Sequence, residues 1–546
     1  MASNLIFWRR DSRSKAGGRN GLLDGDAQGR CRFPASPSKW LRAVPRFILP
    51  VVFFGTLGWV VLMSWFPVEV GRFTNGGDIE RTIARSHLER LGRPARVDNG
   101  GSRRLRLFMP ADGPSVNLCK TIMSAVALGY PTPTLLNWNG EFNRPDWHFA
   151  GSHIAKLESL LAAIDDLYER GDDDDGGGGG VNENDVVLLV DAYDVWFQLP
   201  PSVLIERFHR LNRKADARAR KQWKDLGLEP GFPVGPPTQD IVVTAAKDCQ
   251  PTWESGSDPR YEYWPDSPLP PDFYGNETDR VLPPHVFDPA RRYRRIRPRC
   301  VNSGMVMGTV GSLRGALRKC KSKADAAAAA GRQLWSDQAL LAEVIGDQEV
   351  WRHWVRGLGA AWDGAVSPER PGRGRLPREV RRIADAALAG EAFEFGIGLD
   401  YEAGPPPLPG RAWGDVPLYT DFFFGTAPVG IHHNAYVSGL KAWRLEHWWN
   451  LTWFHPHLRG LATSALAPDR KPAPLARLPL DRDDGRAEMV YWAPERGPGG
   501  AGVGVFDGSK EGRTGYSSIG WDGVCQKGDG KWYDVVFADG EGPLAA

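Results

Sequence analysis

The sequence has almost no net charge and few cysteines. Its 68 Lys and Arg residues against 66 Asp and Glu residues leave a formal charge of +2, so no basic field argues for nucleic-acid binding. Six cysteines in 546 residues, with no C-x-x-C pair, exclude a disulfide scaffold and the common zinc motifs. They suffice for one to three disulfides if the chain enters an oxidising compartment. The chain also lacks a convincing internal repeat.

Apolar residues, glycine and proline are plentiful. A hydrophobic content of 42% is enough for a sizeable core, which excludes wholesale disorder. The 64 glycines and 44 prolines make up about a fifth of the chain, against a usual roughly 12%. Long loops or unstructured stretches therefore accompany the core. The length allows two to four domains, or one large domain with tails.

Charge is absent from residues 47–66, FILPVVFFGTLGWVVLMSWF, a run long enough to cross a bilayer as a helix. A buried core helix is the alternative, but it would show a polar stripe. Ten Lys and Arg residues against three Asp residues precede the run. The positive-inside rule therefore puts residues 1–46 in the cytosol as a basic tail and the rest in the lumen. A cleaved signal peptide fits less well, because the run is long and starts late. We predict a single-pass type II signal anchor.

Strand and helix patterns alternate along the remaining chain, which predicts an α/β domain with a mainly parallel sheet. Strands are expected at 105–109, 186–190, 241–245 and 305–307. Helices are expected at 154–168, at 199–211, from 312 and at 333–344. We divide the lumenal part into a stem at 67–103, the main domain at 104–455, and a Pro/Gly-rich tail or small appendage at 456–546.

Two carboxylates follow the most apolar of these strands in the string VVLLVDAYDVWF. Asp191 comes directly after five apolar residues, and Asp194 follows three residues later. Ligands of open α/β sheets bind outside the carboxyl ends of strands, and paired carboxylates there suit a hard divalent cation. The alternative makes Asp191 a helix N-cap and Asp194 an ordinary turn acid.

Three further motifs accompany this pair. Asn302, Ser303 and Gly304 stand at the entrance of an expected strand, and Asp337 opens an expected helix, where an acid suits the dipole. Near the end of the main domain, His432 and its neighbour His433 follow an apolar stretch. Taken singly, these motifs are better explained as a turn, a helix N-cap and satisfied surface histidines.

Together, and in this order, the motifs resemble a known family. The chain is similar to the glycosyltransferase domain at the N-terminus of multifunctional procollagen lysyl hydroxylases and to single-domain relatives of it. The resemblance covers roughly residues 104 to 455 and includes the helix around Lys156. The matching segments are LLVDAYDVWF, VVTAAKDC (242–249), VNSGMVMG (301–308), SDQALL (336–341), IGLDYE (397–402) and IHHNA (431–435). The resemblance implies a GT-A fold that uses UDP-sugars with manganese. No hydroxylase motif is apparent in the C-terminal part.

The resemblance also assigns roles to residues. It implies that Asp191, Asp194 and His432 hold Mn²⁺ against the diphosphate, with His433 as the alternative third ligand. It further implies the following roles: Tyr193 stacks on uracil, Asn302, Ser303, Gly304 and Lys156 line the donor site, and Asp337 faces the acceptor as the first candidate for a catalytic base.

The resulting prediction is a GT-A-like, Rossmann-like lumenal domain behind one membrane anchor. It would transfer sugar from a UDP-sugar to a protein or glycan in the Golgi or endoplasmic reticulum, with no nucleic-acid partner. Two sequons, at Asn276 and Asn450, agree with a lumenal body. A sugar-nucleotide hydrolase and a non-catalytic lectin or scaffold with a retained fold are the alternatives. The donor sugar, the acceptor, the stereochemistry, the disulfide pairing and the oligomeric state are left open by the sequence.

Overall fold

The apolar run Val186–Val190 forms β3, a fully buried strand of a ten-stranded sheet in the computed structural model. The structure describes residues 88–92, 98–147, 150–172, 181–228, 231–250, 255–281, 290, 292–360, 376–402, 419–421, 424–434, 439–482, 485–494, 502–508, 515–526, 528 and 530–544. These residues lie in one compact unit, Thr74–Ala546. The predicted cytosolic tail and anchor at 47–66, and most of the predicted stem, lie outside the described residues.

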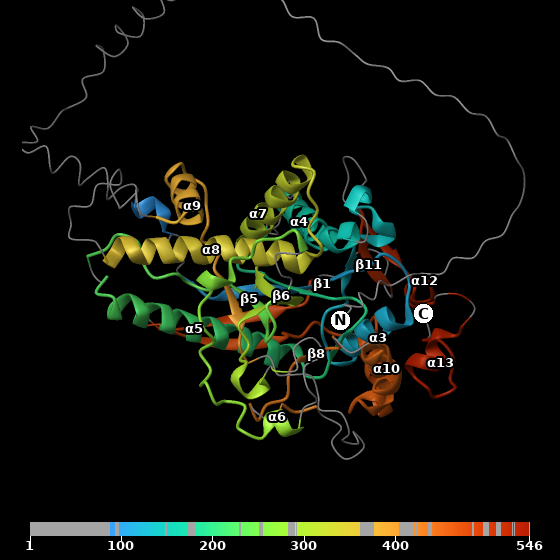
Figure 1. The fold of residues 1–546 in the computed structure, drawn as a ribbon. Helices are drawn as coiled ribbons and strands as arrows, with labels where there is room; N and C mark the ends of the chain where they lie inside the picture. Colours follow the sequence, from blue (N-terminus) through green and yellow to red (C-terminus); the bar gives the residue numbers. More distant parts are fainter. Residues whose placement is uncertain are drawn as a thin grey trace, which may run out of the picture. The chain divides into compact units, whose positions relative to one another are not determined.

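The structure is mixed α/β with a largely parallel central sheet (Figure 1), as the alternation predicted. The strands are β1 (Gly101–Pro110), β2 (Thr134–Leu136), β3, β4 (Val195–Phe197), β5 (Ile241–Ala246), β6 (Cys300–Thr309), β7 (Ile397–Asp400), β8 (Gly430–His432), β9 (Ala476–Arg482), β10 (Gly485–Trp492), β11 (Val503–Phe506) and β12 (Tyr516–Ile519). The sheet order is β12-β11-β2-β1-β3-β6-β5-β7, with β10 beside β1 and β9 beside β10. Strands β4 and β8 form a second, two-stranded sheet.

Helices cover both faces of the sheet. They are α3 (Val116–Ala127), α4 (Ala150–Asp172), α5 (Pro201–Asp225), α6 (Thr278–Val281), α7 (Val310–Ala329), α8 (Asp337–Ala360), α9 (Arg378–Leu388), α10 (Leu440–His447), α11 (Leu458–Leu466), α12 (Trp521–Cys525) and α13 (Trp532–Val536). Among the described residues, no helix is both long and apolar enough to span a membrane.

The alternation of side chains along β3 explains the two layers. Val186, Leu188 and Val190 pack into one core cluster with α3 and α5, whereas Val187 and Leu189 pack into another with α4, α7 and α8. Successive strand side chains point to opposite faces, so an unbroken apolar strand is buried on both sides. Figure 1 shows α4, α7 and α8 on one side of the sheet and α3 and α5 on the other.

Strand β6 runs against its neighbours. It pairs antiparallel with both β3 and β5, while β1, β2 and β3 are mutually parallel where they pair. The β5 pairing jumps from Val243 opposite Val306 to Thr244 opposite Asn302. Residues 303–305 are therefore extra on β6 relative to β5, and this bulge takes Ser303 and Gly304 of the predicted motif out of pairing with β5.

The segment after residue 456, expected as a tail or small appendage, belongs to the central sheet. Strand β10 pairs parallel with β1, and β11 pairs parallel with β2. Trp532 and Tyr491 are fully buried in the cluster around α3. A disulfide joins Cys119 on α3 to Cys525 on α12. These contacts fasten the end of the described chain to the core of the main domain.

Candidate metal centre

The two predicted aspartates flank the turn between β3 and β4. Asp191 is the first residue beyond β3, and its backbone N–H donates to the carbonyl oxygen of Gly304 at 2.9 Å. Asp194 comes directly before β4 and is buried. A buried strand that ends at Val190 thus delivers both carboxylates to the edge of the sheet, where open α/β sheets bind ligands.

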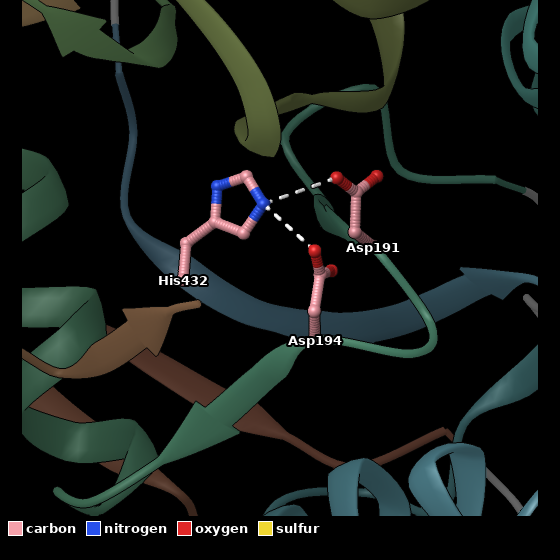
Figure 2. Close-up of side chains that lie close together, drawn as sticks. All are labelled: Asp191, Asp194 and His432. Carbon is pink, nitrogen blue, oxygen red and sulfur yellow. Dashed lines mark ion pairs between the residues drawn. The ribbon is translucent and has the colours of Figure 1, made fainter. Parts of the chain in front are cut away.

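His432 joins them from the far end of the domain. Strand β8 pairs with β4 so that His432 lies opposite Val195. Its Nε2 atom is 3.3 Å from Oδ2 of Asp194 and 3.5 Å from Oδ2 of Asp191, and Figure 2 shows the three side chains converging. One ligand atom from each residue fits within a span of 4.8 Å, so the group could hold a metal ion.

Asn302 orients the imidazole ring of His432. The Oδ1 atom of Asn302 lies 3.0 Å from Nδ1 of His432 and accepts the backbone N–H of Gly304 at 3.2 Å. Because this oxygen is an acceptor, Nδ1 of His432 donates to it, and Nε2 faces the two carboxylates. Such a partner behind a histidine ligand fixes its tautomer and direction. The predicted donor-site residue Asn302 therefore supports the metal centre directly.

Gly304 leaves room for the same ring. A Cβ atom built on Gly304 would lie 2.3 Å from Nδ1 of His432 and 2.4 Å from its Cε1. We expect Gly304→Ala to displace the imidazole and to lower divalent-metal affinity about 10- to 100-fold, the usual cost of disturbing a ligand's support. Isothermal titration with Mn²⁺ measures this loss. A matched change at Gly315, where a Cβ meets only Phe395 at 3.9 Å, should leave the affinity unchanged; equal losses in both would contradict the steric explanation.

Two lysines hold the carboxylates. The buried ammonium of Lys156 donates to Oδ1 of Asp191 at 2.6 Å and to the carbonyl oxygen of Ser303 at 2.7 Å, and lies 2.9 Å from Asp337. Burial alone would lower the pKa of Lys156, but the charges of Asp191 and Asp337 outweigh it and raise the pKa. Lys156 thus makes two hydrogen bonds and a further ion pair to groups around the centre.

The second lysine is Lys441 on α10, whose Nζ atom forms an ion pair with Asp194. Burial alone would raise the pKa of Asp194, but His432 and Lys441 outweigh it and hold that pKa well below its ordinary value. Lys441 is half exposed. Sequence reasoning missed it, because a lone lysine outside any motif carries no signal.

Asp337 opens α8, as predicted. Ser336 accepts the N–H of Ala339 through its Oγ at 3.1 Å and caps the helix, and Gln338 accepts the N–H of Ser303 at 3.2 Å. Burial alone would raise the pKa of Asp337, but the ion pair with Lys156 dominates and lowers it. A carboxylate with a lowered pKa is a weak base, so Asp337 is better suited to holding Lys156 than to taking a proton.

Tyr193 lies between the two aspartates and is fixed by its hydroxyl. The O–H donates to Oδ1 of Asp112 at 2.6 Å and accepts the N–H of Asp112 at 3.1 Å. Burial, together with the nearby Asp112 charge, raises the pKa of Tyr193. The ring is therefore held beside the centre by the loop that follows β1.

His433 is not an alternative ligand. It is 1% exposed, its ring packs 4.1 Å from Trp196, and burial lowers its pKa to about 3. Neither ring nitrogen has a hydrogen-bond partner within the described part of the chain. Successive side chains of an extended segment point to opposite sides, so only His432 can face Asp191 and Asp194.

The donor set and its charge fit a divalent cation. Carboxylates are hard oxygen ligands, and imidazole binds transition metals. The aspartates at 191, 194 and 337 and the lysines at 156 and 441 leave one net negative charge with His432 neutral. A divalent ion would convert this to a net positive charge, which favours a phosphate-bearing ligand. The set does not by itself select manganese.

Comparison with known proteins does not identify the chain. No protein-family model matches it, and neither does any curated protein. What the protein does is therefore inferred from the geometry of Asp191, Asp194 and His432 and from the sequence motifs that meet around them.

Proposed function

We propose that the protein is a glycosyltransferase that uses Mn²⁺ and a UDP-sugar and acts on a protein or glycan in the secretory pathway. The observation that carries the proposal is the convergence of Asp191, Asp194 and His432 at the carboxyl end of β3. The family resemblance supports it, because the motifs that carry the resemblance are those that meet at this point of the fold.

Asp191, Asp194 and His432 would hold the metal. When bound, the metal supplies positive charge that stabilises the negative charge developing on the β-phosphate of the departing UDP. Lys441 adds a second positive charge beside Asp194, where the diphosphate would bind. Tyr193, fixed through its hydroxyl by Asp112, offers its ring to the uracil.

Two observations support a lumenal location behind the predicted anchor at 47–66. Four cysteines form the disulfides Cys119–Cys525 and Cys249–Cys300, and disulfides persist in oxidising compartments. Both sequon asparagines, Asn276 and Asn450, are exposed. The redox state of the four cysteines in protein isolated from cells tests this location, and free thiols at these positions would contradict it.

The test is UDP release by the purified full-length chain from a panel of UDP-sugars, with Mn²⁺ or with a chelator. We expect one donor to be turned over in a metal-dependent way and faster when an acceptor protein or glycan fraction is added. Rapid release that no acceptor accelerates would instead identify a sugar-nucleotide hydrolase. Metal-dependent binding of a donor without any release would indicate a sugar-binding protein.

A further inference from the structure

Asp400, the last residue of β7, lies in the same row of sheet residues as Asn302 of the metal centre. Thr244 on β5 lies opposite Asn302 on β6 and also opposite Asp400 on β7. Side chains of directly opposed residues in neighbouring strands share one face of a sheet. Asp400, Thr244 and Asn302 therefore form one row, and Asn302 is the residue that contacts His432.

Thr244, the middle residue of this row, contacts Asn302 through its side chain. Thr244 donates its hydroxyl to the carbonyl oxygen of Asn302 at 2.6 Å and lies 3.3 Å from Oδ1 of that residue. Neighbouring strands are about 4.8 Å apart, which puts the Cα atoms of Asp400 and Asn302 about 10 Å from each other. Thr244 lies between these two residues on the same face of the sheet.

One oxygen of Asp400 is available. Its Oδ1 accepts the backbone N–H of Glu402 at 2.9 Å, and its Oδ2 has no hydrogen-bond or ion-pair partner in the part of the chain that the structure describes. The cationic side chains of α5 near Asp400 have other hydrogen-bond or ion-pair partners. Arg207 donates to the carbonyl of Ala427 at 2.6 Å, and Arg210 pairs with Glu402, as does Lys214.

The surroundings make Asp400 a better base than Asp337. Burial, with a smaller contribution from the charge of Glu402, raises the pKa of Asp400 to about 6, although the Glu402 N–H, Arg207 and Arg210 act in the opposite direction. Asp337 has a lowered pKa and is paired with Lys156. A base is most effective when its pKa lies near the working pH.

We propose that Asp400 is the catalytic base of the reaction and that transfer proceeds with inversion. This inference rests on the proposed glycosyltransferase function. Oδ2 of Asp400 takes the proton of the acceptor hydroxyl as its oxygen forms a bond to the anomeric carbon. The bond from that carbon to the β-phosphate oxygen breaks, and its electron pair leaves with UDP. Asp400 then returns the proton to water.

Water can serve as the acceptor in the test, so no natural acceptor is required. Full-length wild type and Asp400→Asn are incubated with Mn²⁺ and UDP-glucose or UDP-galactose, whichever is turned over, and NMR follows the released sugar. Asparagine keeps an Oδ1 acceptor for the Glu402 N–H. We expect the β-anomer to appear first from these α-linked donors, and release by the variant to fall by about 10²- to 10⁴-fold with unchanged Mn²⁺ affinity.

The pH dependence gives a second readout. Release by the wild type should rise through pH 6 to a plateau, because Asp400 must lose its proton to act. Glu402→Gln removes a neighbouring negative charge, so the rise should move to lower pH. Difference infrared titration of wild type against Asp400→Asn should show one carboxyl group protonating near pH 6, whether or not sugar is turned over.

The outcomes separate the two proposals. Release by the wild type with the α-anomer first, or release by Asp400→Asn within threefold of wild type, overturns the role of Asp400 and leaves the glycosyltransferase function standing. Absence of any release by the wild type, with any donor, overturns both. Asp165→Asn, on α4 and paired with Arg314 and Arg318, is the matched control and should behave as wild type.

Discussion

Replacement of Asp194 by asparagine is expected to weaken metal binding and to slow UDP release by orders of magnitude. The carboxylate is buried, and its Oδ2 atom lies 3.3 Å from Nε2 of His432. A neutral amide in its place removes one of three ligands and one negative charge from the centre. Metal assistance is worth several kcal/mol in the transition state, so we expect the rate to fall on the order of 10²–10⁴-fold.

Two measurements check this result. Titration with Mn²⁺ followed by electron paramagnetic resonance reports the affinity, and the UDP-release assay reports the rate. The thermal midpoint should fall only slightly, because asparagine has nearly the same volume and Lys441 is half exposed and can be solvated once its ion pair with Asp194 is lost. Asp225→Asn, at the end of α5 and paired with Lys221, is the control. A variant at Asp194 that binds Mn²⁺ as tightly as wild type would refute the metal centre.

The double variant C119A/C525A should be much less stable than the wild type. The disulfide joins residues 406 positions apart and fastens α12 to α3, where the Ser115 N–H also donates to the Val524 carbonyl at 3.0 Å. Removing a native disulfide typically costs about 2–5 kcal/mol, mainly by freeing the unfolded chain. We expect a lower thermal midpoint and faster proteolysis near the C-terminus.

Cys320 provides a control for the loss of sulfur alone. It is a free, buried cysteine on α7, so Cys320→Ala removes a sulfur atom without breaking a bond. A single small cavity should cost on the order of 1 kcal/mol. A reductant should lower the midpoint of wild type more than that of C119A/C525A. If the double variant is as stable as Cys320→Ala, the C-terminal segment is not fastened as the structure indicates.

Local pattern alone determined the main elements. The five apolar residues of β3 formed a strand buried on both faces, and the apolar periodicity from Ile154 formed α4. The position of Asp191 directly after that strand could be predicted from the sequence for the same reason. These features depend on neighbouring residues, because backbone geometry repeats every two residues in a strand and every 3.6 in a helix.

Tertiary contacts decided the rest. The sequence motifs predicted that His432 would join Asp191, but only the β4–β8 pairing brings them together and turns His433 toward Trp196. A short apolar run does not reveal the direction of its strand. The sequence therefore predicted neither the antiparallel orientation of β6 nor its bulge.

The sequence by itself thus determined which segments become strands and helices and which carboxylates end a strand. Only the folded chain decided that the residues after 456 complete the central sheet, that Lys441 pairs with Asp194 and that Asp400 lines up with Asn302. These features depend on pairing between distant segments. Its free energy comes from burying surface that neither segment can bury alone.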